Sequence, residues 1–509
     1  MNWISRCKLP ATKAIKHNGH QCLSLESLWD TLHSTFNTAL NRQVDLNILS
    51  KIEYKATSLW YSFSKEEFKQ VISKCNDSSA PGPDKLTWCH LKYIIKQDKC
   101  LVNIINIADM CINLGHWLNY FKYSTTVIIP KPNKTLYDQP KSFHPIVLLN
   151  TLGKLIEKVI AERIQFMVAS NDFIHPSQLG GLKFKSTTDA SVTLTHIVQS
   201  GWVKGKMTST LAFNISQFFP SLNHQLLTLI LEKAGLESKV SSFFTNYLVK
   251  RNTSCVWNNL SSPNFKVNVG VGQGSALSSI LSALYLSPFL HILEKRLKNL
   301  KIPIYILSFV DDGLIIVQNK SLDISNAYLF CSYNVLSKLL HSFGLIIEHA
   351  KTEIFHFNRL YEVFNPPPLD LLPIRGPMLL PKDTWKYLDF IFDQKLTFHQ
   401  HINHYLNKAI STIKYMKLLG NLSRGISPIQ KYQLYRCCVL PIALYDFQLW
   451  FYNNAPMLYH MKILDKMQRR AAIWILVVFK ISPTEGIEAI TGIIPIKFHL
   501  QKLAKRSQI

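Results

Sequence analysis

A chain of 509 residues exceeds the roughly 250–300 residues at which a single hydrophobic core stops growing, so we expect two or three packed lobes. Apolar residues make up 47% and charged residues 17%, a balance that excludes a disordered chain. Lysine and arginine number 57 against 32 aspartates and glutamates, and the formal charge of +25 predicts a polyanionic partner such as nucleic acid.

The predicted elements alternate between strands and helices up to about residue 400 and are helical after it. In chain order they begin with a mixed helical stretch over residues 1 to about 60, a Pro/Gly turn at 78–86, a helix at 88–95, a strand at 124–132, a helix at 153–170 and a strand at 210–215. They continue with a helix from 223, a glycine-punctuated loop and buried helix at 270–286, two strands within 304–317, a proline-rich connector at 365–377, a strand pair at 385–398 and basic helices to the end. This order predicts an α+β lobe followed by a helical lobe.

The cysteines and the apolar runs bear on the compartment. Ten cysteines without a CxxC pair or histidines at zinc spacing indicate free thiols in a reducing environment. The first residues, "MNWISRCKLPATK", contain no apolar signal core, so we expect an intracellular protein of the nucleus or cytoplasm. The uncharged run from Val267 to Leu293 is long enough to cross a bilayer, but its Asn268, Gln273 and Pro288 favour a buried helix and no membrane segment.

Two adjacent aspartates in "SFVDDG" lie between two apolar runs. Asp312-Gly313 in that setting is typical of a two-residue hairpin turn. Neighbouring carboxylates repel each other unless a cation lies beside them, and oxygen ligands of this kind suit Mg²⁺. A third carboxylate at the end of the strand 210–215 would complete a two-metal site for phosphoryl transfer. Asn214 occupies that position instead.

The motifs in their order resemble the reverse transcriptases of non-LTR (LINE-type) retrotransposons. The resemblance runs collinearly from about residue 78 to 402, and each motif alone is weak whereas eight in order are specific. They are "APGPDKL", "VIIPKP" with "FHPIVLLNTLGKLIEKVI", "QLGGLKFKSTTDA", "AFNISQFFPSLNH", "GVGQGSALSSILSALYL", "SFVDDG", "GLIIEHAKTEIFHF" and "YLDFIFDQKLTFHQHI".

The resemblance implies an α+β right-hand polymerase with fingers, a palm that carries an antiparallel sheet, and a helical thumb. We expect an N-terminal helical extension or linker over 1–77, fingers and palm over 78–402, and a basic helical thumb with a truncated C-terminal region over 403–509. No endonuclease-like region is recognisable before residue 78 and no ribonuclease H-like region after the thumb, so endonuclease activity would have to come from elsewhere.

The resemblance also implies the catalytic residues. Asp311 and Asp312 match the family's aspartate pair, which binds two Mg²⁺ ions, with Mn²⁺ as an alternative, together with an aspartate that Asn214 replaces here. Lys351, in "AKTE", matches a lysine proposed as general acid toward pyrophosphate. Asp389 stands in the primer grip where the family usually has glycine, and a side chain there is expected to disturb a tight backbone approach.

Five further residues match nucleotide-binding positions of the family. Phe219 matches a bulky residue that excludes the ribose 2′-hydroxyl and so selects dNTPs. Gln273 and Gly274 match the loop against the incoming nucleotide and template. Lys131 matches a lysine that meets the triphosphate, and His144 stands where its arginine companion is usual.

The helical C-terminal segment is expected to contact nucleic acid. From Lys395 to Tyr445 the chain contains no Asp or Glu, whereas basic residues recur. Such a single-sign surface favours phosphate contacts. The residues that we expect to make them are Lys408, Lys414, Lys417 and Arg424.

Three functions remain open at this point. The first is an RNA-directed DNA polymerase that uses an RNA template, a DNA primer and dNTPs, in a degenerate copy impaired by Asn214. The second is a catalytically silent nucleic-acid-binding remnant. The third is an RNA-dependent RNA polymerase. Phe219 disfavours it, and so does "FVDD", because viral RNA-dependent RNA polymerases more often carry Gly before the aspartate pair.

Overall fold

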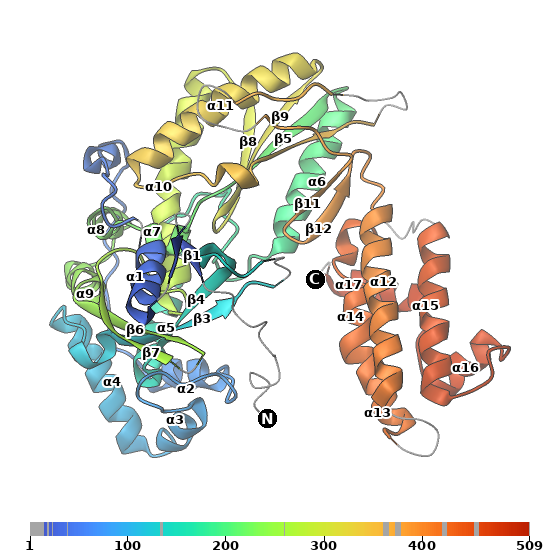
Figure 1. Ribbon diagram of the computed structural model, residues 1–509, viewed down its shortest axis with the longest axis horizontal. Helices are drawn as coiled ribbons and strands as arrows, with labels where there is room; N and C mark the ends of the chain where they lie inside the picture. Colours follow the sequence, from blue (N-terminus) through green and yellow to red (C-terminus); the bar gives the residue numbers. More distant parts are fainter. Residues whose placement is uncertain are drawn as a thin grey trace.

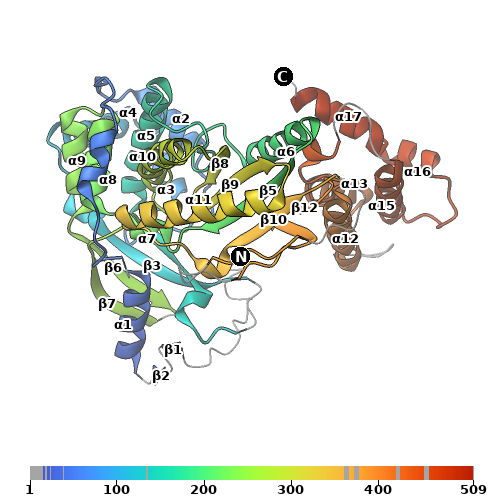
Figure 2. The same cartoon turned by 90° about the horizontal axis from the view of Figure 1, so that it is seen from above.

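The computed structural model describes residues 15–17, 20–22, 24–37, 39–132, 136–258, 260–359, 366–371, 378–419, 425–451 and 458–507. The predicted α+β class is confirmed. Two four-stranded sheets and their covering helices form the larger part of the molecule, and a helical lobe lies beside it (Figure 1). The same separation of the red C-terminal helices from the rest is visible from above (Figure 2).

The first sheet, which we call the palm sheet, is antiparallel throughout. Its strands are β5 (Met207–Asn214), β8 (Ile304–Phe309), β9 (Asp312–Asn319) and β10 (Glu353–Phe357), in the order β10-β5-β9-β8. In this register Asn214, the last residue of β5, pairs with Asp312, the first residue of β9. Strand pairing alone therefore brings position 214 next to the aspartate pair.

The palm sheet is buried on both faces. Along β9, Ile315 and Val317 belong to one hydrophobic core, whereas Leu314 and Ile316 belong to another. This alternation follows from the two-residue period of a strand. A continuous apolar run in the sequence therefore marks a strand between two cores, and the site at its end rests on a rigid support.

The second sheet, which we call the fingers sheet, joins segments far apart in the chain. Its strands are β3 (Tyr123–Pro130), β4 (Phe143–Leu149), β6 (Arg251–Trp257) and β7 (Leu260–Val267), in the order β4-β3-β6-β7. The β3–β6 pair is parallel and the other pairs are antiparallel. The sequence analysis did not predict β6 and β7.

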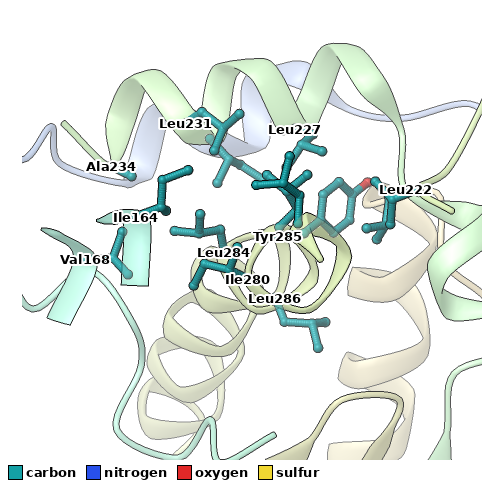
Figure 3. Packing of buried hydrophobic residues seen from close by; sticks show 14 of the residues in the cluster. Ile164, Val168, Leu222, Leu227, Leu231, Ala234, Ile280, Leu284, Tyr285 and Leu286 are labelled. Carbon is teal, nitrogen blue, oxygen red and sulfur yellow. The ribbon is translucent and has the colours of Figure 1, made fainter. Parts of the chain in front are cut away.

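The helix α10 (Leu277–Asn299) is the centre of the larger core. Figure 3 shows its Ile280, Leu284 and Tyr285 packed between Leu227 and Ile164 of neighbouring helices. It is the one helix among the described residues that is long and apolar enough to cross a membrane, and 83% of its apolar window is buried inside the protein. Burial of each such large side chain contributes about 1.5–3 kcal/mol to the stability of the fold. The helix is therefore a buried core element, as the sequence predicts.

Helix α5 (Thr151–Ser170) begins against the predicted Pro/Gly turn. The Asp84 carboxylate accepts a hydrogen bond of 2.7 Å from the Thr151 backbone N–H, and the Asn150 side chain accepts one of 3.0 Å from the Asp84 N–H. A carboxylate at a helix N-terminus satisfies an orphan donor and complements the dipole. A Cβ at Gly82 would lie 2.0 Å from the Leu149 carbonyl oxygen, so glycine is required for this approach.

The remaining helices and strands agree with the sequence prediction wherever the sequence predicted an element, as for the helix α3, the strand β3 and the strand pair β11–β12. Around the two sheets lie β1 (Lys16–His17), β2 (His20–Gln21), α1 (Leu25–Phe36), α2 (Lys65–Ser73), α3 (Trp88–Ile94), α4 (Asp98–Asn113), α6 (Thr187–Val203), α7 (Phe218–Ser221), α8 (His224–Lys233), α9 (Ser238–Leu248), α11 (Leu322–Ser342), β11 (Thr384–Tyr387) and β12 (Phe390–Asp393). The predicted connector 365–377 lies largely outside the described residues.

The helical lobe, which we call the thumb, shares the second core with the palm sheet. Its helices are α12 (His399–Met416), α13 (Pro428–Leu434), a π-helix (Tyr435–Val439), α14 (Leu440–Ala443), α15 (Leu458–Leu476), α16 (Thr484–Thr491) and α17 (Ile496–Ser507). Phe355 of β10 and Phe392 of β12 join Leu406 of α12 and Leu464 of α15 in that core. The strand pair β11–β12 thus connects palm and thumb.

Candidate active site

The β8–β9 hairpin turns two residues earlier in the chain than the sequence predicts. Phe309 pairs with Asp312, so Val310 and Asp311 form the two-residue turn and Asp312-Gly313 begins β9. Val310 takes a positive φ of 57°, which is strained for a β-branched residue. The prediction of Asp312-Gly313 as the turn was wrong because the glycine serves another purpose.

That purpose is a close contact with β5. A Cβ at Gly313 would lie 2.2 Å from the ring of Phe213, far inside van der Waals contact. Phe213 is buried and faces Gly313 across the ladder. The ring therefore fills the space of the missing side chain and fixes β9 against β5 beside the aspartates.

Asn214 lies between the two aspartates. Its side-chain Nδ2 donates hydrogen bonds to Oδ1 of Asp312 at 2.7 Å and to Oδ2 of Asp311 at 3.1 Å. The residue is buried, with 8% of its surface exposed. Amide N–H groups thus occupy the position between the carboxylates, where the sequence led us to expect a cation.

Lys351 fixes the orientation of that amide. Its Nζ donates to Oδ1 of Asn214 at 3.3 Å, so the amide oxygen faces the ammonium group and the amide nitrogen faces the carboxylates. Lys351 ends a single 3₁₀ turn, His349–Lys351, just before β10. The Glu348 N–H donates to the Asn214 carbonyl oxygen at 2.8 Å, which anchors this turn to β5. Four predicted residues therefore form one network.

The site shifts the pKa of the Asp312 carboxyl upward. Burial raises the pKa of its carboxyl, and the neighbouring Asp311 raises it further. The hydrogen bond from Asn214 and the charge of Lys351 act in the opposite direction without cancelling the rise. The one group between the two carboxylates is a neutral hydrogen-bond donor. The negative charge of the pair is therefore not fully compensated by neighbouring positive charge.

The four residues line an open pocket of about 460 Å³ whose other walls come from β10 and β11. Tyr387 of β11 is one of its lining residues, and the Tyr387 hydroxyl has no hydrogen-bond partner among the described residues. Burial and the charge of Asp312 both raise the pKa of that hydroxyl. Sequence reasoning missed Tyr387, because it reads as an ordinary aromatic residue of a short strand.

The residues present fit a divalent cation only in part. Asp311 and Asp312 are suitable oxygen ligands. The Asn214 amide presents nitrogen to them, and a turn of the amide that offered its oxygen would place N–H groups against the Lys351 ammonium. Within the described ranges no group of three or more His, Cys, Asp or Glu side chains has the arrangement of a metal site.

The predicted triphosphate residues lie on the β3–β4 hairpin. The Lys131 N–H donates to the Ser142 carbonyl oxygen at 2.9 Å and extends the ladder by one step beyond its last pair, Pro130–Phe143. Burial lowers the pKa of His144, and the charges of Lys131 and Lys351 lower it further. The fingers hairpin and the palm lysine therefore both lower the pKa of one histidine, which favours its neutral form.

The predicted sugar and template residues meet at one loop. The Val271 N–H donates to the Phe219 carbonyl oxygen, and the Val147 N–H donates to the Gln273 carbonyl oxygen, both at 2.8 Å. Gly274 has a φ of 126°, and a Cβ there would lie 2.5 Å from the Val147 carbonyl oxygen. The loop thus connects Phe219 of α7 with β4, and the ring of Phe219 is only partly buried.

A buried carboxylate that the sequence analysis overlooked holds this loop. Glu157 of α5 accepts hydrogen bonds from the Ser275 hydroxyl at 2.6 Å, the Tyr247 hydroxyl at 3.1 Å and the Ala276 N–H at 3.3 Å. Burial raises the pKa of Glu157 despite these bonds. Its position on the apolar face of the predicted helix 153–170 was a signal that could have revealed it.

Asp389, the predicted departure in the primer grip, forms the β11–β12 turn. Leu388 and Asp389 have positive φ values of 47° and 68°. Glycine would take this conformation without strain, and aspartate is one of the residues that tolerate it. The Asp389 carboxylate makes a 2.8 Å ion pair with Lys386, and its carbonyl accepts from the Tyr405 hydroxyl.

The predicted thumb contacts are exposed but do not form one stripe. Lys408 and Lys414 lie on α12, and Lys417 follows it. Lys408 and Lys414 are six positions apart on the helix, which places them about 120° apart around its axis. Arg424 lies outside the described residues.

Comparison with known proteins agrees with this geometry. The family model described as "Reverse transcriptase (RNA-dependent DNA polymerase)" matches residues 129–392, more than half of the chain. The chain is 23% identical over 401 residues to "Probable RNA-directed DNA polymerase from transposon BS" of Drosophila melanogaster, over 76% of this chain and 42% of that protein. It is 22% identical over 387 residues to the RNA-directed DNA polymerase from mobile element jockey of Drosophila funebris, over 76% and 41%.

A third relative is the Pol polyprotein of the type-1 retrotransposable element R2 of Popillia japonica, 24% identical over 263 residues, 50% of this chain and 35% of that one. The chain thus spans about two fifths of the length of the first two relatives. Among solved structures, apo telomerase from Candida tropicalis, truncated from its C-terminal domain, aligns with a TM-score of 0.38 and 14% identity over 54% of this chain and 53% of that one.

Proposed function

Because the chain belongs to the reverse transcriptase (RNA-dependent DNA polymerase) family, with relatives in LINE-type elements, we propose that it extends a DNA primer with dNTPs on an RNA template. Its fold is the right-hand polymerase fold of that family, with fingers and palm over 78–402 and the thumb over 403–509. Three relatives share the RNA-directed DNA polymerase description over three quarters of this chain.

The observation that carries this proposal is the meeting of Asn214, Asp311, Asp312 and Lys351 at the open end of the palm sheet. Phosphoryl transfer requires anionic oxygen ligands on a rigid support and a nearby cationic donor for the leaving group. Asn214 and Asp312 lie at the paired ends of adjacent strands that are buried on both faces, Asp311 lies in the turn just before β9, and Lys351 lies in a turn anchored to β5.

The roles follow from position. We assign the aspartate pair to cation binding, with two Mg²⁺ ions as the cofactor that the family implies and Mn²⁺ as a substitute. Lys351 is the candidate proton donor to pyrophosphate. Lys131 and His144 face the triphosphate, where a neutral imidazole contributes a hydrogen bond but no charge. Phe219 selects the deoxyribose sugar, and Gln273 and Gly274 contact the nucleotide and template.

We further propose that Asn214 impairs catalysis. A neutral amide leaves the site with two formal negative charges instead of three. In addition, its nitrogen faces the carboxylates because Lys351 holds the oxygen. Loss of weaker, indirect contacts to a metal already costs about 10–100-fold, so replacement of a direct ligand should cost at least that.

The second candidate function is nucleic-acid binding without polymerisation. The bridging amide favours it specifically, since hydrogen bonds from Asn214 satisfy both carboxylates without a cation. The net charge of +25 supports binding in either case.

Primer extension separates the two candidates. The native chain and an Asp311→Asn/Asp312→Asn variant are compared on an RNA template with a labelled DNA primer, dNTPs, and Mg²⁺ or Mn²⁺. Extension by the native chain alone supports the polymerase. Primer-template binding by both with extension by neither supports the remnant. An arm with rNTPs tests RNA synthesis.

A further inference from the structure

The thumb contains a second pocket that shares no residue with the one at the palm. It has a volume of about 320 Å³ and lies between the helix that contains the π-turn and the last helix, α17. Its basic residues are Arg436, His499, Lys502 and Arg506, and Tyr432 flanks them. In Figure 2, α17 lies at the upper edge of the thumb near α6, whereas α12 lies at the lower edge.

The charge in this pocket is of one sign. Arg436, Lys502 and Arg506 are exposed, and no ion pair within 4.0 Å joins any of them to an acid among the described residues. Burial lowers the pKa of His499, and these three cations lower it further. Like charges gathered without acids repel one another, so the pocket is stabilised when an anion enters it.

The Glu488 carboxylate, which lies beyond the pocket lining, is already engaged in hydrogen bonding. Gln468, fully buried on α15, donates to Glu488 Oε1 at 2.7 Å and to the Ile494 carbonyl oxygen at 3.2 Å. It accepts from the Tyr435 hydroxyl at 3.0 Å. This network joins the π-helix, α15 and α16 to the loop before α17, so the floor of the pocket is rigid and Glu488 faces inward.

The wall that carries Arg436 is a π-turn, a conformation that recurs at functional sites. Pro441, two residues beyond it, has no N–H for the carbonyl of residue 437 and its ring would clash with that group, which gives a local reason for the irregular turn. The Arg436 guanidinium lies 5.7 Å from the centre of the Tyr432 ring. An aromatic face beside free cations suits a nucleobase attached to its phosphate.

We propose that this pocket binds single-stranded nucleic acid outside the primer-template cleft, with phosphates on Arg436, Lys502 and Arg506 and a base on Tyr432. The inference extends the proposed function, because a polymerase must also guide the strand that is not paired in its cleft. It does not require that the chain catalyse extension.

The test measures binding of labelled 20-nucleotide RNA and DNA strands by fluorescence anisotropy across a salt series. Lys502→Gln/Arg506→Gln should reduce the slope of log K against log salt by about 1.4, which is about 0.7 for each lost phosphate contact on a single strand. The matched control is Lys497→Gln/Lys505→Gln, because both lysines are exposed on the same helix but do not line the pocket. The control removes the same charge.

The aromatic contact is tested separately. Tyr432→Ala should weaken single-strand binding about 5- to 150-fold, the effect of one lost stacked base, whereas Tyr432→Phe should not. Equal slopes for the pocket and control variants would overturn the proposal, and so would equal affinities for Tyr432→Ala and Tyr432→Phe. RNA and DNA arms identify the preferred strand. Binding of a short primer-template duplex should be unaffected by the pocket variants. If the native chain does not bind that duplex, the result counts against the polymerase proposal and not against the pocket.

Discussion

The amide nitrogen of Asn214 lies 2.7 Å from the Asp312 carboxylate, on the side of the side chain opposite to Lys351. One side chain therefore connects the ammonium group to the aspartate pair. Substitution at position 214 changes both contacts at once, which makes it the most informative position in the chain.

Asn214→Asp should increase dNTP incorporation on an RNA template by at least about 10–100-fold, because it restores a third carboxylate to the cation site. His144→Arg should increase it further by adding a bidentate charged contact to the triphosphate. Asp312→Asn in the same background should abolish the gain. An Asn214→Asp protein that is folded and binds primer-template, but is no more active than the parent, would contradict the assignment.

The same substitution should make stability dependent on metal. Three clustered carboxylates without the amide donor should lower the free energy of unfolding by about 1–3 kcal/mol in EDTA. Mg²⁺ or Mn²⁺ should restore it in Asn214→Asp and change the native chain much less. Thermal unfolding of both proteins with EDTA or 10 mM Mg²⁺ measures this without reference to activity. Equal shifts in both would argue against a role of position 214 in cation binding.

The raised pKa of Asp312 predicts a pH dependence of stability. Because the pKa is higher in the folded state, this carboxyl contributes stability that is fully present below its unfolded value near 3.9 and is lost as pH rises through the folded value. Asp312→Asn should remove that loss. Denaturant unfolding of native and variant proteins from pH 4 to 7 gives the two slopes, and identical slopes would contradict the prediction.

Phe219→Ala should admit rNTPs, since the ring is only partly buried and its backbone is tied to the loop that carries Gln273. The measurement is the ratio of dNTP to rNTP incorporation. It is made in the Asn214→Asp background, where we expect measurable activity. Phe218→Leu is the control, because Phe218 is buried and its ring centre lies 5.8 Å from that of the partly buried Phe219. An unchanged ratio would leave Phe219 as a core residue.

Gly313→Ala should destabilise the protein by about 1–3 kcal/mol through its clash with the Phe213 ring. Phe213→Leu in the same chain should recover part of the loss. Gly486→Ala serves as control, because a Cβ there meets its nearest atom at 3.6 Å on a helix and should be neutral or slightly stabilising. Denaturant unfolding of all four proteins provides the comparison.

The sequence predicted the components of the site better than their contacts. The strand pattern placed Asn214 at the end of a strand and suggested that it lies near the aspartate pair, and the structure shows that it pairs with Asp312. The direction of the amide could not be predicted, because it depends on Lys351 more than 130 residues away. The turn at Val310 was missed because Asp-Gly favours a turn locally. In the structure Gly313 lies in β9, after the turn, where the Phe213 ring leaves no room for a side chain. Strand β6 was missed because its parallel pairing with β3 joins segments far apart in the chain and leaves no local signal, and its antiparallel partner β7 was missed with it.

The two cores on either side of the palm sheet affect any attempt to divide the molecule. The second core is closed by Leu406 and Leu464 of the thumb against Phe355 and Phe392. A protease cut just before α12 would sever the chain but not this contact. We therefore expect the two fragments to elute together in size-exclusion chromatography and to separate only in denaturant.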